Sequence, residues 1–131
     1  MWEWETSVVL VRSAADELLF VRQDYGHRFF GLPGGRVEAG EEPQAAAVRE
    51  LFEETGLTAD TVAFLRTYDL VYPGTDSSYG AHVFVCDRYW GELATNVPDE
   101  ISSVGWWSLG ELPSPLTPSA HVVVRDLTRP S

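Results

Sequence analysis

The chain has 131 residues, which is enough for one domain with its own hydrophobic core. Its formal net charge is −11, from 20 acidic residues against nine arginines and no lysine. A surface of this charge repels nucleic-acid polymers and anionic membranes, whereas a small phosphorylated ligand can bind where a metal ion reverses the sign locally. No apolar run approaches the roughly 20 residues that a membrane-spanning helix needs.

The first residues and the single cysteine favour a cytoplasmic protein. The N-terminal sequence MWEWETSVVLV lacks the basic start and the small-residue cleavage site of a secretory signal. Cys86 has no second cysteine in the chain with which to form a disulfide, as is usual in a reducing compartment. Because Cys86 lies in the apolar run HVFVCDRYW, we expect it to be buried in a strand and chemically inert.

The first half of the chain predicts two strands followed by a helix. The strands are expected at 6–12 and 18–23, with a short turn between them. A loop rich in glycine and proline follows, and Pro43 then stands where the first turn of a helix tolerates proline. The helix is expected over 44–54, with Gly56 as its C-terminal stop.

The second half predicts mainly strands. They are expected at 61–72, 81–90 and 102–109, whereas the apolar tail at 119–127 fits a helix and a strand equally well. Strands on both sides of a central helix favour an α/β fold in which helices cover a mixed sheet. We therefore predict a single domain over residues 1–131.

Three carboxylates cluster on one side of the predicted helix. At about 100° per residue, Glu50, Glu53 and Glu54 fall within an arc of roughly 100°. The opposite side, which is expected to face the core, holds Val48, Leu51 and Phe52. Arg49 stands four positions before Glu53, so it can pair with Glu53 or with Glu41 in the preceding loop.

Two interpretations of these carboxylates remain open at this point. Many surface helices have a solvated acidic face, but such faces usually include basic residues at i+4, and none follows these glutamates. A metal site is the other interpretation, and its oxygen ligands would select Mg²⁺ or Mn²⁺ over Zn²⁺. The preceding Gly34-Gly35 turn favours the metal site, because it allows the backbone to approach a ligand closely.

Taken together, these residues resemble the signature of the Nudix hydrolase family. The pattern is a glycine, five residues, Glu, seven residues, Arg-Glu, an aliphatic residue, any residue, Glu-Glu, any residue, a glycine and an aliphatic residue. Every fixed position is present between Gly35 and Leu57. The predicted order of strands also resembles the family's α/β/α sandwich with a mixed β-sheet.

The resemblance implies hydrolysis of a nucleoside diphosphate linked to another group. It implies that Glu50, Glu53 and Glu54 bind Mg²⁺, or alternatively Mn²⁺, with help from the backbone carbonyl of Gly35. Arg49 and Glu41 are then expected to orient the helix carboxylates. The expected partner is a small nucleotide, and a homodimer is an open alternative to a monomer. A catalytically silent nucleotide-sensing domain of the same fold is the other interpretation.

The general base and the substrate stay open. Glu50 and Glu53 are candidate bases on the helix, and Asp99 and Glu100 are candidates in the acidic loop at 97–101, with Glu100 favoured as a base or further ligand. The aromatic residues that are candidates for stacking on a base are Phe29, Phe30, Tyr72, Tyr79 and Trp107.

The remaining substrate signals conflict. Pro73 lies near the position of a proline in ADP-ribose-hydrolysing relatives, whereas the neighbouring Tyr72 resembles the dinucleoside-polyphosphate group. An ordinary turn explains Pro73 equally well. The histidines show no metal-ligand spacing, and only His27 lies close enough to the glycine loop to be a candidate for phosphate contact.

Overall fold

The computed structural model describes residues 2–129. Among these residues, no helix is long and apolar enough to cross a membrane. The strands and helices follow one another in the order β1 (Trp4–Val11), β2 (Leu18–Gln23), β3 (Phe30–Gly31), β4 (Gly34–Arg36), α1 (Pro43–Thr55), β5 (Thr58–Ala59), β6 (Ala63–Val71), β7 (Ser78–Cys86), β8 (Tyr89–Trp90), β9 (Ile101–Trp107) and α2 (Pro118–Thr128).

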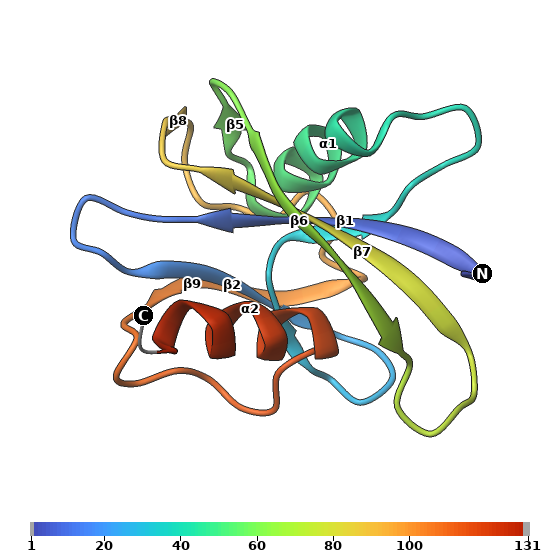
Figure 1. Ribbon diagram of the computed structural model, residues 1–131. Coiled ribbons are helices and arrows are strands. Elements are labelled where there is room, and N and C mark those ends of the chain that lie inside the picture. Colours follow the sequence, from blue (N-terminus) through green and yellow to red (C-terminus); the bar gives the residue numbers. More distant parts are fainter. Residues whose placement is uncertain (1, 130–131) are drawn as a thin grey trace.

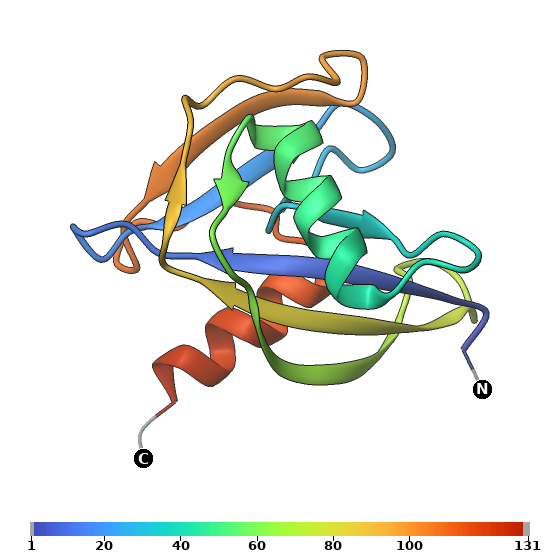
Figure 2. The ribbon, with the colours of Figure 1, turned by 90° about the horizontal axis from the view of Figure 1, so that it is seen from above.

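The strands form a mixed arrangement between two helices. The largest sheet has the order β4-β1-β7-β6, in which β1 and β7 are parallel and the other pairs are antiparallel. A second sheet has the order β3-β2-β9, and β5 pairs with β8. Helices α1 and α2 lie on opposite sides of the strands (Figure 1), and β2 and β9 run side by side, obliquely to β1 and β7 (Figure 2). The α/β sandwich predicted from the sequence is confirmed.

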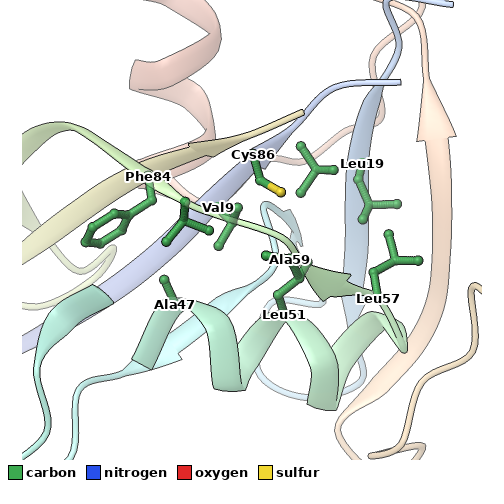
Figure 3. Close-up of a cluster of buried hydrophobic side chains, with 10 residues drawn as sticks. Val9, Leu19, Ala47, Leu51, Leu57, Ala59, Phe84 and Cys86 are labelled. Atoms are coloured by element: carbon green, nitrogen blue, oxygen red, sulfur yellow. The ribbon is translucent and has the colours of Figure 1, made fainter. Parts of the chain in front are cut away.

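Strand β1 explains how one apolar run serves two cores. Val9 and Val11 pack in the core beneath α1, whereas Val8 and Leu10 pack in the core beneath α2. Side chains alternate along a strand, so a central strand covered on both faces reads as a continuous apolar run. Figure 3 shows Ala47 and Leu51 of α1 turned toward Val9.

Both predicted ends of α1 are confirmed, but one predicted core residue is wrong. Pro43 opens the helix, and Gly56 closes it at φ 79°, with its N–H donating to the Phe52 carbonyl oxygen at 2.9 Å. Phe52 was expected in the core, yet half of its surface is exposed. The buried stripe runs instead through Ala47, Leu51 and Glu54, because a backbone donor in β4 draws the Glu54 carboxylate inward.

The strand predicted over 81–90 is two strands. Strand β7 ends at Cys86, which is buried as expected, and after a short break Tyr89–Trp90 pairs with Thr58–Ala59. The ambiguous tail is a helix. Thr117 caps it by accepting a hydrogen bond from the Ala120 N–H at 3.2 Å, and a proline occupies the first turn.

Candidate active site

Five carboxylates from one helix and two loops line one hollow. We call it the acidic hollow; its volume is about 340 Å³, and its walls include Glu50, Glu53, Glu54, Glu100, Arg49, Gly34, Gly35, Arg36, Glu38 and Tyr25. Glu100 comes from the loop before β9 and Glu38 from the loop after β4, whereas Glu50, Glu53 and Glu54 project from the second half of α1. Glu100 therefore joins the helix carboxylates as expected, and the alternative acid Asp99 is not among the lining residues.

Arg49 ties the loop carboxylate to the helix carboxylates. Its guanidinium donates to both oxygens of Glu41, at 2.8 and 2.9 Å, and to Glu50 Oε1 at 2.8 Å. Arg49 also contacts both oxygens of Glu53 at 3.4 Å. The two ion pairs considered from the sequence, with Glu41 and with Glu53, therefore occur together. The hydrogen bonds from Arg49 lower the pKa of Glu41 to about 2, and a bond from the Glu38 N–H adds to this effect.

Glu54 is the most buried acid of the hollow. Its side chain is 9% exposed, and its Oε1 accepts the Gly34 N–H at 2.9 Å. Burial raises the pKa of Glu54 to about 8; the Gly34 bond opposes this shift, and the charges of Glu50, Glu100 and Glu53 add to it. Burial also raises the pKa of Glu50, against the opposing effect of Arg49. The lining of the hollow places five glutamates beside two arginines, Arg36 and Arg49.

Strand β4 meets the carboxylates without a side chain in between. A Cβ atom on Gly35 would lie 2.6 Å from Glu50 Cδ, so only glycine leaves room for Glu50 at this place. A Cβ on Gly34 would lie 2.2 Å from the backbone oxygen of Ser7 in β1. The two glycines thus serve different purposes: Gly34 permits the pairing of β4 with β1, and Gly35 permits the approach of Glu50.

The chemistry of these donors fits a hard divalent cation. Carboxylate and backbone carbonyl oxygens are the usual ligands of Mg²⁺ and Mn²⁺. Within residues 2–129, no three acidic, histidine or cysteine side chains converge on a metal position as they stand. Glu50 and Glu53 are both held by Arg49 in this arrangement, and the raised pKa of Glu54 results first from its burial and then from the neighbouring carboxylates, whose charge a cation would neutralise.

A second cavity adjoins the acidic hollow at β4. We call it the aromatic pocket; its volume is about 340 Å³, and it is lined by Trp4, Thr6, Val8, Gln23, Tyr25, Phe29, Leu32, Gly34, Gly35, Arg36, Tyr72, Tyr79, Thr117, Pro118 and Ser119. Tyr25, Gly34, Gly35 and Arg36 line both cavities. The two spaces are therefore neighbours that meet at the paired glycines.

The aromatic residues singled out from the sequence divide between this pocket and the core. Phe29, Tyr72 and Tyr79 line the pocket. Phe30 and Trp107 instead contact each other, with ring centroids 5.6 Å apart, in the core beneath α2. His27 lies beside Phe29 and Tyr72, with ring centroids 5.0 and 6.3 Å away.

Several lining residues were not anticipated from the sequence. The Trp4 ring stacks on Tyr79 at a centroid distance of 5.1 Å, and the Arg36 guanidinium lies 4.7 Å from the centre of the Trp4 ring. Arg36 directly follows Gly35, so its place within the motif was an available signal. Gln23 and Tyr25 gave no such signal, because the fold alone brings the end of β2 and its following loop to the pocket.

Comparison with known proteins identifies this arrangement. A family model described as the NUDIX domain matches residues 3–127. The oxidized purine nucleoside triphosphate hydrolase of Danio rerio is 32% identical over 108 residues, covering 82% of this chain and 67% of that protein. The ADP-ribose pyrophosphatase of Methanocaldococcus jannaschii is 35% identical over 104 residues, covering 76% of this chain and 57% of that protein.

A solved structure agrees in fold. The crystal structure of the MutT NUDIX hydrolase from Burkholderia pseudomallei superposes with a TM-score of 0.87 at 24% identity, covering 95% of this chain and 98% of that chain. The motif between Gly35 and Leu57, the fold and the family match agree with one another. The chain belongs to the Nudix family and is a Nudix hydrolase that acts on pyrophosphate bonds.

Proposed function

We propose that this protein is a Mg²⁺-dependent pyrophosphohydrolase, with Mn²⁺ as the alternative ion, that cleaves the diphosphate of a small nucleotide. The observation that carries the proposal is the contact between the two cavities at Gly34 and Gly35. A flat base suits the aromatic pocket, and the phosphates of the same molecule would then reach the acidic hollow. The relatives whose names specify a purine nucleoside triphosphate or ADP-ribose act on ligands of this kind.

The carboxylates of the hollow have two different proposed roles, metal binding and activation of water. Glu50, Glu53 and Glu54, with the Gly35 carbonyl, are the proposed ligands of the divalent ion. When bound, such an ion offsets the charge of the diphosphate and makes a coordinated water more acidic. Glu100 is the proposed base for that water, since within residues 2–129 no hydrogen bond or ion pair engages its carboxylate. Arg49 and Glu41 hold the helix carboxylates in place.

The test is a substrate screen with a matched variant. Purified protein is incubated with nucleoside triphosphates, ADP-ribose, nucleotide sugars and dinucleoside polyphosphates in Mg²⁺ or Mn²⁺, and the products are separated by chromatography. Glu54→Gln keeps an oxygen for the Gly34 N–H but removes the charge, so we expect activity to fall by about 100-fold or more while the melting temperature is maintained or rises. Glu111→Gln, at an exposed site outside both cavities, is the control.

Two outcomes would contradict the proposal in different ways. Full activity in Glu54→Gln would contradict the proposal that Glu54 binds the metal ion. Binding of a nucleotide without hydrolysis across the whole panel would favour the nucleotide-sensing alternative. Loss of activity in Glu100→Gln with metal binding unchanged would support Glu100 as the base, whereas loss of both would make it a ligand.

A further inference from the structure

Strand β6 leaves one long edge of the largest sheet open. It is the last strand in the order β4-β1-β7-β6, and Figure 2 shows it in green on the side of β7 away from β1. A bulge at Leu65 interrupts only its beginning, because from Arg66 to Val71 it pairs with β7 residue by residue. Within residues 2–129, no strand pairs with its outer edge. The unpaired backbone groups of such an edge can bind a further strand.

The side chains of β6 do not protect this edge. Natural edge strands are commonly blocked by lysine or proline, and β6 contains neither. Three of its apolar side chains are instead exposed, namely Phe64, Leu65 and Val71, at 62%, 48% and 55%. Several large apolar side chains on one open strand indicate a surface that another protein covers.

The charge of β6 favours a second copy of this chain as that protein. Because the whole chain has a net charge of −11, two copies repel each other overall. Strand β6 contains one arginine and one aspartate, Arg66 and Asp69, so its own net charge is zero. Two copies can therefore meet at this edge without adding to the repulsion between them.

A two-fold axis limits how two copies of β6 can pair. In an antiparallel pair of identical strands related by such an axis, one residue lies opposite its own copy. With Arg66 or Asp69 at that position, like charges would face each other directly. With Thr67 there, two threonines face each other, and Arg66 of each copy lies opposite Tyr68 of the other, on the same face of the sheet.

Pairing about Thr67 also brings opposite charges together. The Tyr68 hydroxyl donates to Asp126 Oδ2 at 2.5 Å, so Asp126 of one copy would lie beside Arg66 of the other. The guanidinium of Arg66 has five N–H donors and is more than half exposed, so it can contact this second Asp126 in addition to that of its own chain, 3.3 Å away. We propose that β6 is a dimer interface, through which a second copy of this chain extends the sheet by antiparallel pairing about Thr67. Such a dimer forms whether or not the protein hydrolyses nucleotides.

Sedimentation velocity over a range of protein concentrations tests the dimer. We expect the wild-type protein to change from monomer to dimer as its concentration rises. Leu65→Asp places a charge within the interface and should raise the dissociation constant at least about tenfold. Leu93→Asp adds the same charge at another exposed leucine, outside β6, and should dimerise as the wild-type protein does.

A charge exchange identifies the contact across the axis. Arg66→Glu places like charges at both contacts between Arg66 and Asp126 of opposite copies, and Asp126→Arg does the same. Each variant alone should therefore remain a monomer at concentrations at which the wild-type protein is a dimer. In an equimolar mixture the contacts unite opposite charges again, and we expect a mixed dimer. Repair within one chain cannot produce this result, since each variant chain still has like charges at its own two positions.

Two results would overturn the dimer itself: a wild-type monomer at every concentration, or a dimer that Leu65→Asp leaves as strong as that of the wild-type protein. Separate monomers in a mixture of folded Arg66→Glu and Asp126→Arg would contradict the pairing about Thr67. Thermal melts show whether each variant is folded. Leu65→Asp changes an exposed side chain, so it tests the interface even if Asp126→Arg, which removes the acceptor of the Tyr68 hydroxyl, does not fold.

Discussion

At the scale of single residues, the shape of Arg49 matters as much as its charge. One guanidinium contacts Glu41 through two nitrogens and reaches Glu50 and Glu53 with a third. A lysine ammonium carries the same charge but cannot reproduce this planar fork. The positions of the helix carboxylates therefore depend on a residue that need not contact the substrate.

Arg49→Lys tests that dependence. We expect a loss of about 1–3 kcal/mol in unfolding free energy, measured in urea, because hydrogen bonds to charged partners are lost in a half-buried place. Hydrolysis should fall as well, since Glu50 and Glu53 are no longer held. Arg88→Lys, at an exposed ion pair of 3.5 Å with Asp60, should change neither quantity measurably. Wild-type stability and activity in Arg49→Lys would show that charge alone suffices.

At the scale of elements, strand β4 separates two roles of adjacent glycines. Gly35→Ala places a methyl group against the end of the flexible Glu50 side chain, so Glu50 must move while the backbone stays. Gly34→Ala places the methyl group against the backbone of Ser7 and disrupts the pairing with β1. We expect Gly35→Ala to unfold near the wild-type temperature with greatly reduced hydrolysis, and Gly34→Ala to unfold at a clearly lower temperature. Equal melting temperatures for the two variants would contradict this division.

The helices and strands also show which elements local sequence patterns can predict. Strand β1 and helix α1 were predictable, because hydrophobic periodicity, Pro43 and Gly56 are local signals. The two-residue strands β3 and β5 were not, because they are too short for any period and exist through pairing with distant partners, and β8 was predicted only as the end of one longer strand. The exposure of Phe52 was missed for a similar reason: the burial of Glu54 depends on the Gly34 N–H, 20 residues away in the chain.

The same distinction applies to the two cavities. The carboxylates of the acidic hollow lie mainly in one continuous motif, so the sequence identified Glu50, Glu53, Glu54, Arg49 and Glu41 as a group. The aromatic pocket is assembled from β1, β2, β4, β7, the adjoining loops and the first turn of α2. No spacing in the sequence links those segments, so only the fold could separate Tyr79, in the pocket, from Trp107, in the core.

At the scale of the whole molecule, the negative charge is concentrated where a cation would bind. The net charge of −11 means that any salt screens repulsion and stabilises the fold somewhat. A specific site adds a second effect, because an ion that binds only the folded protein stabilises it in proportion to its occupancy. The two effects differ in how they depend on Glu54, which is buried among other carboxylates.

Thermal unfolding in MgCl₂ and in NaCl of equal ionic strength distinguishes them. For the wild-type protein we expect Mg²⁺ to raise the melting temperature beyond the NaCl value and to saturate, with a stabilisation of about 2.7 kcal/mol at a hundred times the Kd. Glu54→Gln should respond equally to both salts, since it keeps the overall charge nearly unchanged but lacks the buried carboxylate that is proposed to bind the ion. Glu111→Gln should behave as wild type. Identical responses of the wild-type protein to the two salts would mean that Mg²⁺ acts only by screening, because a bound ion must add stability that an equal ionic strength of Na⁺ cannot supply.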